Sequence, residues 1–196
     1  MRVRLVYSKR CGACFVPHIA LAQIFSRSAS RAGFRLMMTQ GFSPRAKLSF
    51  GPELPAGVVA LNEPVDIWFD GEPQDLTARL NASLPEGFSI SRVLYPPEDS
   101  PNLGKSCRHA EYLIRNIHGL ELSDLAKNFY GEAVFMLERD GEWLRLILDA
   151  PSQTPIGGLI KHMIHENIIA GWHEMNIVRT AVGIYDEQEG RVLINA

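Results

Sequence analysis

The sequence predicts an α+β fold made of two consecutive βαββαβ units. Segments with strand-like alternation and segments with helical spacing follow one another in the order strand, helix, strand, strand, helix, strand, and the same order then recurs. A Pro-rich segment typical of a linker separates the two runs. The repeated order is the ferredoxin-like pattern. We therefore expect two four-stranded antiparallel sheets, each with two helices on one face, in units at residues 1–96 and 110–196 joined by a linker at 97–109.

The elements of the first unit follow from local patterns. Residues 2–7 begin by alternating charged and apolar side chains, as a strand does. Residues 17–32 carry apolar side chains at three- and four-residue steps, with Pro17 suited to the first helical turn and Gly33 to the position just past the end. The other expected elements are a strand at 34–38, a loop at 39–57, a strand at 64–70, a helix at 73–84 and a strand at 88–94.

The second unit repeats this order. Ser123 is a suitable N-cap for a short helix, and Asp140-Gly141 is a strong hairpin signal between two strands. The expected elements are strands at 111–117, 133–139, 143–148 and 177–185, helices at 123–129 and from 154 onward, and an edge hairpin at 191–194. Each unit has fewer than 100 residues and would bury little core alone, so we expect the two units to pack together.

Charge is distributed unevenly along the chain. Residues 1–52 contain nine Lys or Arg residues and no Asp or Glu, whereas the rest of the chain holds 11 basic and 22 acidic residues. If the nine cations share a surface, they predict a phosphate-binding site; the alternative is that they pair with the acidic remainder. Phe42 lies among them and is suited to stacking on a base. The candidate nucleic-acid-binding residues are Arg27, Arg31, Gln40, Phe42, Arg45 and Lys47.

Cys11 and Cys14 have the spacing of metal ligands, and His18 follows four residues later. A structural zinc site needs four ligands, and Cys107 with His109 would have to complete it. The alternative is a pair of small, partly buried thiols at a turn between a strand and a helix. His18 is also the candidate catalytic residue, as a general base, unless it only orders the neighbouring loop by hydrogen bonding.

Several classes of protein are excluded or disfavoured. No apolar run approaches the roughly 20 residues of a transmembrane helix, and the first ten residues resemble a strand and not a signal peptide. Three cysteines cannot form a disulfide framework, so we expect a cytoplasmic protein without a membrane partner. The sequence has no Walker-type phosphate loop, no dinucleotide fingerprint and no nucleophile elbow.

The first 57 residues carry the most specific motifs of the chain. These are the opening segment Val3-Arg-Leu-Val-Tyr-Ser-Lys-Arg10, then Gln40-Gly-Phe-Ser-Pro44, Lys47-Leu-Ser-Phe-Gly51 and Leu54-Pro-Ala-Gly57; Ile177-Val-Arg179-Thr180 with Tyr185 matches more weakly near the end. Together they resemble a radical-SAM-linked domain family of unknown function, whose members stand alone or are fused to the C-terminus of a radical SAM protein of the cobalamin-binding type. The chain departs from the family at Ala20, where the family has Asp, and at Arg45, where it has His.

The resemblance implies a cytoplasmic accessory protein that works with a radical SAM protein. The chain lacks the three-cysteine motif of radical SAM chemistry, so S-adenosylmethionine and an iron–sulfur cluster are expected only on the partner, with no cofactor on this chain. The resemblance and the basic first quarter together predict that this chain binds an RNA substrate, either tRNA or rRNA, for the radical SAM partner. The chain is expected not to be catalytic on its own.

Two alternatives belong to other classes. Tandem ferredoxin-like folds resemble the endonucleases that process CRISPR transcripts. In this alternative, His18 with Lys47 or Arg45 cleaves RNA without a metal, and general acid–base help from a His contributes about 10²–10⁴-fold. The other alternative is a module that binds only protein.

Overall fold

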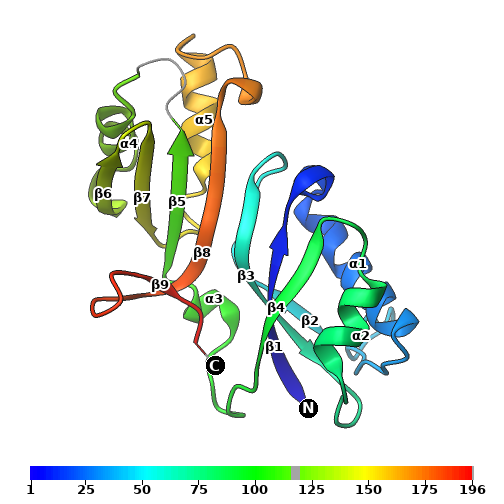
Figure 1. Cartoon of the computed structure of the whole chain (residues 1–196). Helices are drawn as coiled ribbons and strands as arrows, with labels where there is room; N and C mark the ends of the chain where they lie inside the picture. Colours follow the sequence, from blue (N-terminus) through cyan, green and yellow to red (C-terminus); the bar gives the residue numbers. More distant parts are fainter. Residues whose placement is uncertain (116–119, 196) are drawn as a thin grey trace.

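The computed structural model describes residues 1–115 and 120–195, which form an α+β fold around one large, mostly antiparallel sheet (Figure 1). Nine strands of the described residues join this sheet in the order β4-β1-β3-β8-β5-β7-β6, with β2 paired to β3 and β9 paired to β8. The strands are β1 (Arg2–Lys9), β2 (Leu48–Phe50), β3 (Val59–Trp68), β4 (Phe88–Leu94), β5 (His109–Arg115), β6 (Val134–Asp140), β7 (Trp143–Asp149), β8 (Asn176–Asp186) and β9 (Arg191–Leu193). The helices are α1 (His18–Arg31), α2 (Leu76–Ser83), α3 (Leu103–Ser106), α4 (Leu122–Tyr130) and α5 (Ile156–His165), with short 3-10 turns at Cys11–Phe15, Gly131–Ala133 and Trp172–Glu174.

The first half buries one face of β1, β3 and β4 beneath α1 and α2, which lie together on one side of these strands (Figure 1). Alternate residues of each strand point to the same face, and here the inward set of β3 includes Val65 and Ile67. Phe25 of α1 and Leu80 of α2 are fully buried against that set. Gly33 has φ +76°, so it ends α1 as the sequence predicts.

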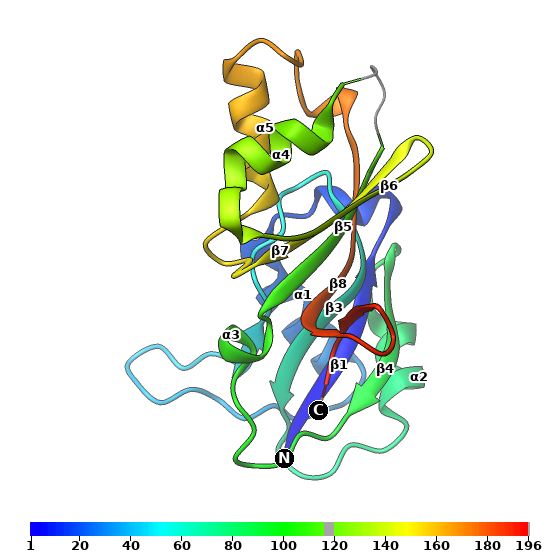
Figure 2. The same cartoon turned by 90° about the vertical axis from the view of Figure 1, so that its left-hand side faces the viewer.

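The second half forms its own core where α4 and α5 cover β5, β7 and β8 (Figure 2). Leu146 of β7 and three residues of α5, Leu159, Ile160 and Met163, are at most 1% exposed in this core. The predicted hairpin is present: β6 and β7 pair, and Gly141 with φ +58° lies in the turn between them. The last two residues of the strand predicted at 111–117, which precedes this hairpin, lie outside the described residues.

The sequence predicts two separate sheets, one in each half, and this prediction is wrong: the structure has one sheet. Val59 and Ala60 of β3 pair in parallel with Val178 and Arg179 of β8, which joins all strands into one sheet. The reason is that β2 has three residues and pairs only with the far part of β3, from Val65 to Ile67. The beginning of β3 is therefore left as an open edge, and an open edge readily pairs with another strand.

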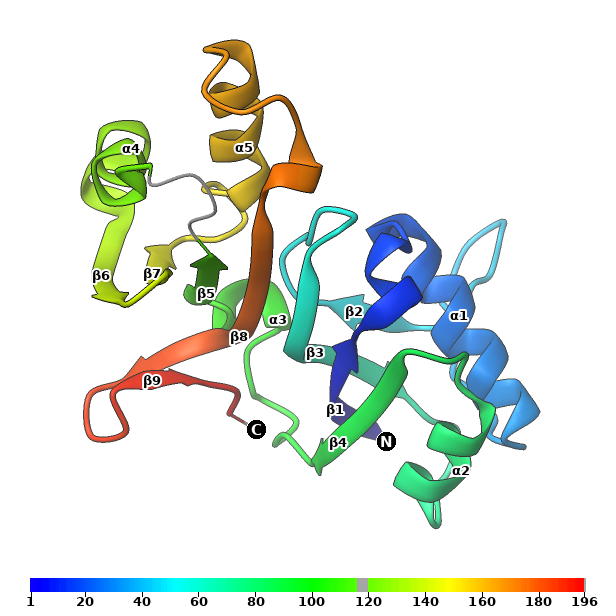
Figure 3. The ribbon, with the colours of Figure 1, turned by 45° about the horizontal axis from the view of Figure 1, so that its top comes forward.

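The remaining differences lie in short elements. The predicted strand at 34–38 is reduced to two isolated bridges, Leu36 to Phe69 and Met38 to Ala46. Strand β2 lies inside the predicted loop at 39–57, and α3 lies inside the predicted linker. The segment after β9 runs toward the first half (Figure 3), where Arg4 of β1 donates to the carbonyl of Asn195 at 2.6 Å. No helix in the described ranges is long and apolar enough to cross a membrane.

Candidate nucleic-acid interface

A groove of about 540 Å³ lies between α1 and the segment that follows it. Its lining residues are Ser26, Arg27, Ser30, Phe34, Arg35, Leu36, Met38, Ala46 and Asp70. Two arginines, Arg27 and Arg35, therefore border a surface whose other members are mostly apolar or small. This groove has the size of a small-ligand site, which typically occupies about 300–1,000 Å³.

The wall opposite α1 is held in place by contacts around Phe34. Gly33 reverses the chain after α1, so that Phe34 packs its ring against Phe69 with centroids 5.6 Å apart. The guanidinium of Arg79 lies over the ring of Phe34, 4.2 Å from its centroid, and donates to the carbonyl of Ala32 at 2.5 Å. The last turn of α1 and the start of the groove wall are thus fixed by one arginine from α2.

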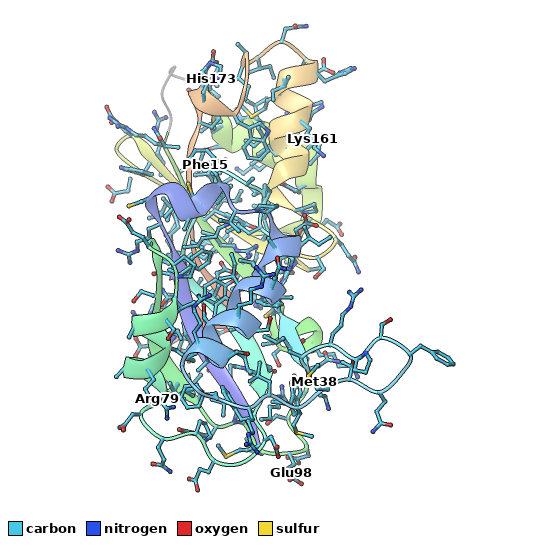
Figure 4. The ribbon with its side chains drawn as sticks, turned by 90° about the vertical axis from the view of Figure 1, so that its right-hand side faces the viewer. Phe15, Met38, Arg79, Glu98, Lys161 and His173 are labelled. Atoms are coloured by element: carbon cyan, nitrogen blue, oxygen red, sulfur yellow. The ribbon has the colours of Figure 1, made fainter. Side chains whose placement is uncertain are left out.

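A hairpin at residues 38–46 projects from one end of the groove (Figures 2 and 4). Met38 pairs with Ala46, and the amide of Thr39 donates to the carbonyl of Arg45 at 2.7 Å. The amide of Arg45 donates in turn to the hydroxyl of Thr39 at 3.1 Å. The tip at 40–44 is exposed, including Gln40, and the side chain of Phe42 is fully exposed. An apolar ring without protein contacts at a hairpin tip is suited to stacking on a base.

The structure divides the nine cations of residues 1–52, and the predicted shared surface contains only part of them. Arg2 and Arg4 do point to the same side of their strand, but both bind the buried carboxylate of Asp66. Lys9 is 2% exposed and donates to the carbonyl of Val16 at 3.0 Å, and burial lowers its pKa. Arg31 donates to the carbonyl of Ser83 at 2.7 Å and to the hydroxyl of Ser28 at 3.0 Å.

Lys47 lies on the other face of the sheet from the groove. Its ammonium is 4.7 Å from the ring centroid of Trp68, a cation–π contact. Ala46 lines the groove beside α1, and successive side chains of an extended segment point to opposite faces. Of the six predicted nucleic-acid-binding residues, the structure therefore gathers Arg27 at the groove and Gln40, Phe42 and Arg45 on the adjoining hairpin, while Arg31 and Lys47 have other contacts.

His18 begins α1 and is half-buried, with its ring 5.7 Å from that of Phe50 in an edge-on contact. Burial lowers its pKa, and the nearby carboxylate of Glu53 opposes that shift. Phe50 lies three residues beyond Lys47 in an extended segment, so the two side chains point to opposite faces. The predicted pairing of His18 with Lys47 is not assembled.

The three cysteine residues differ in their exposure to solvent. Cys11 is exposed, whereas Cys14 and Cys107 are buried, and burial raises the pKa of Cys107 to about 12. Within residues 1–115 and 120–195, no three His, Cys, Asp or Glu side chains are grouped so that they could hold a metal ion. The zinc site considered from Cys11, Cys14, His18, Cys107 and His109 is therefore not formed.

Sequence reasoning misses three residues at or near the groove, namely Arg35, Asp70 and Arg79. Arg35 is one of the nine cations but belongs to no motif, and Asp70 and Arg79 lie outside the basic segment. The sequence offers only indirect signals for the positions of Arg35 and Asp70. Gly33 predicts the chain reversal that brings Arg35 back beside α1, and Asp70 is the last residue of a predicted strand.

The comparison with known proteins gives a family but no activity. No curated protein is significantly similar to the chain in sequence. The model of the family described as "Uncharacterized protein conserved in bacteria (DUF2344)" matches residues 2–145, which is more than half of the chain. The match carries no statement about radical SAM proteins, so that part of the resemblance stays a prediction. The chain belongs to this uncharacterized bacterial family.

Proposed function

We propose that the chain binds an unpaired segment of RNA in the groove between α1 and residues 34–46. The observation that carries the proposal is the combination of Arg27 and Arg35 with apolar lining residues in one groove, beside the hairpin that carries the fully exposed ring of Phe42. Arginine suits phosphate because its planar guanidinium can donate two parallel hydrogen bonds. Apolar lining residues and a free aromatic ring suit bases that are not paired.

Charge pairing supports the same assignment. Within the described part of the chain, neither Arg27 nor Arg35 takes part in an ion pair, unlike Arg2 and Arg4 of the same basic segment. Unpaired RNA fits better than a duplex, because an A-form helix is read mainly through its wide minor groove over a long footprint. A groove of about 540 Å³ instead has room for single splayed nucleotides.

The proposed role is to hold this RNA for a radical SAM partner, as the motifs of residues 3–57 imply by resemblance. S-adenosylmethionine and an iron–sulfur cluster would then belong to the partner. This placement is supported by the burial of Cys14 and Cys107, which leaves Cys11 as the exposed cysteine. Co-purification of the chain with a radical SAM protein tests this part, and recovery of the chain without one from cells that express both would contradict it.

The strand order supports a finer description of the fold. The sets β4-β1-β3-β2 and β8-β5-β7-β6 both place the fourth, first, third and second strands of a βαββαβ unit side by side. We therefore describe the molecule as two ferredoxin-like units whose sheets are fused at β3 and β8. In this description, the RNA groove belongs to the first unit alone.

RNA binding is tested with a fluorescein-labelled, unstructured RNA at about 50 and 200 mM salt. Wild type should bind with a log–log salt slope of roughly −0.7 per phosphate contact. The double variant Arg27→Ala/Arg35→Ala should bind at least about tenfold more weakly, with a shallower slope. The matched control, Arg92→Ala/Arg108→Ala, removes two exposed arginines away from the groove.

The control double variant should lose much less affinity than the groove variant. If both lose affinity equally, binding reflects overall charge and not the groove. If wild type does not bind at 50 mM salt, the proposal is wrong.

A further inference from the structure

Asp70 is a carboxylate in a groove otherwise suited to phosphate. It lines the groove between α1 and residues 34–46, and it also lines an adjoining hollow of about 270 Å³ that reaches Arg79. The two hollows share Phe34, Arg35 and Asp70 in their linings, so they adjoin at these residues, and we call them together the track. Met38 lines the first hollow and Arg79 the second, and Figure 4 labels both residues.

The main chain on both sides of Asp70 is fixed, so its side chain is carried on a rigid support. The amide of Asp70 donates to the carbonyl of Arg35 at 2.9 Å, and the amide of Phe69 donates to the carbonyl of Met1 at 2.8 Å. Gly71 has φ +98°, a conformation that favours glycine, and turns the chain away directly afterwards. Asp70 therefore stays at the rim of the track.

Two ordinary roles for this carboxylate are absent from the structure. An Asp that forms a turn typically accepts a hydrogen bond from the backbone two residues later, but no such bond to the Asp70 side chain occurs in the described residues. Asp70 also forms no ion pair there, although Arg27 and Arg35 line the same groove. Its acceptor oxygens are thus available to a ligand.

An acceptor-only group repels phosphate and attracts donors. On the Watson–Crick edge of guanine, N1–H and the N2 amino group donate in parallel, which matches the two oxygens of a carboxylate. Adenine, cytosine and uracil do not offer two adjacent donors on that edge. We propose that this track selects a guanine base through Asp70, while Arg27 and Arg35 contact the flanking phosphates; the inference rests on the RNA-binding function proposed above.

The experiment measures base preference at one position. Labelled nonauridine RNAs carry guanine, adenine, cytosine or inosine at the central position, and their affinities are compared at about 100 mM salt. Inosine is the sharpest probe, because it keeps N1–H and lacks the N2 amino group. A bidentate contact to a base is worth about 1–3 kcal/mol of discrimination. We therefore expect guanine to bind about tenfold more tightly than adenine and about threefold more tightly than inosine.

Asp70→Asn should abolish the preference for guanine over inosine, because an amide offers one acceptor where the carboxylate offers two. The matched control is Glu86→Gln, which removes an exposed carboxylate that lines neither hollow. It should keep the guanine preference. A purely electrostatic role of Asp70 would instead raise the affinity for all four RNAs equally in Asp70→Asn, and that result would overturn the inference.

The outcomes separate this inference from the proposal on which it rests. If wild type binds none of the RNAs, RNA binding itself is wrong. If wild type binds all of them equally, with loss of binding in Arg27→Ala/Arg35→Ala, the groove binds RNA and the guanine assignment is wrong. A thermal unfolding curve of Asp70→Asn that matches wild type shows that lost selectivity is not lost folding.

Discussion

Arg179 of β8 and Glu63 of β3 form a two-point ion pair across the junction of the two halves. Nε and Nη2 of Arg179 lie 2.7 and 2.6 Å from the two carboxylate oxygens of Glu63, and both side chains are almost fully buried. The guanidinium also donates to the carbonyls of Pro52 and Glu53, at 2.9 and 3.2 Å. One arginine thus ties together β3, β8 and the loop that precedes β3.

Removing either partner of this pair should destabilise the protein strongly. Arg179→Met leaves the Glu63 carboxylate buried without its cation, which typically costs about 3–5 kcal/mol. Replacing both residues, as in Arg179→Met/Glu63→Met, should cost less than the sum of the two single variants, because no unpaired charge remains. Urea unfolding of the four proteins measures this coupling. Strictly additive effects would show that the two side chains do not depend on each other.

Phe42 should matter for RNA binding and not for stability. Its ring is fully exposed at the hairpin tip, so Phe42→Ala should change the free energy of unfolding by less than about 0.5 kcal/mol. Stacking of a base on an aromatic ring is worth about 1–3 kcal/mol, so the variant should bind unpaired RNA about 5- to 150-fold more weakly. Binding is measured by fluorescence anisotropy.

Phe15→Ala is the matched control for that experiment. Phe15 is also a largely exposed phenylalanine, at 70%, but it lies next to Gly57 and not at the hairpin. Its removal should leave the affinity for RNA unchanged. Equal losses in both variants would mean that the effect of Phe42 is not local to the hairpin.

Local patterns in the sequence predict the local parts of the fold. The helix before Gly33 follows from the spacing of its apolar side chains. Its end and the hairpin at Gly141 follow from glycines, which readily adopt positive φ. The pairing of Val59 with Val178 cannot be seen in this way. This pairing is possible because β2 has only three residues and leaves the start of β3 unpaired. The segment around β2 is rich in Gly and Pro, so the sequence predicts a loop there and not a strand.

The candidate site is predictable only in part for the same reason. The excess of cations in residues 1–52 points to the half that contains the groove, and three of the predicted residues, Arg27, Phe42 and Arg45, lie at the groove or on the adjoining hairpin. The excess of cations does not reveal that Arg4 pairs with Asp66, 62 residues away, because the register of β1 against β3 sets that pairing. Nor does it reveal Asp70, which reaches the groove from the end of β3.

The stability of the protein should fall as the pH drops through the range in which His18 titrates. Burial lowers the pKa of His18 in the folded state below its ordinary value of about 6.5. Between the folded-state pKa and about 6.5, the unfolded chain binds more protons, so the free energy of unfolding decreases as the pH falls. Burial lowers the pKa of His109 as well, which adds a contribution of the same sign.

Urea midpoints at pH 7.5, 6.5 and 5.5 isolate the contribution of His18. The decrease between pH 7.5 and 5.5 should be smaller in His18→Gln than in wild type, because His109 is present in both proteins. His165→Gln serves as the control, since the side chain of His165 is 84% exposed. An unchanged decrease in His18→Gln would show that His18 is equally easy to protonate in both states.

Gly183 should be required for the pairing of β8 with β9. A Cβ atom at this position would overlap the carbonyl oxygen of Leu193 in the facing strand, and a backbone atom cannot move away without displacing β9. Gly183→Ala should therefore lower the free energy of unfolding by about 1–3 kcal/mol, the usual cost of overpacking. It should also make the C-terminal segment more sensitive to protease, because Asn195, whose carbonyl accepts from Arg4, lies only two residues after the end of β9. Gly12→Ala is the control, since a Cβ there has no atom within 4 Å. Equal urea midpoints for the two variants would mean that β9 adapts to a side chain at residue 183.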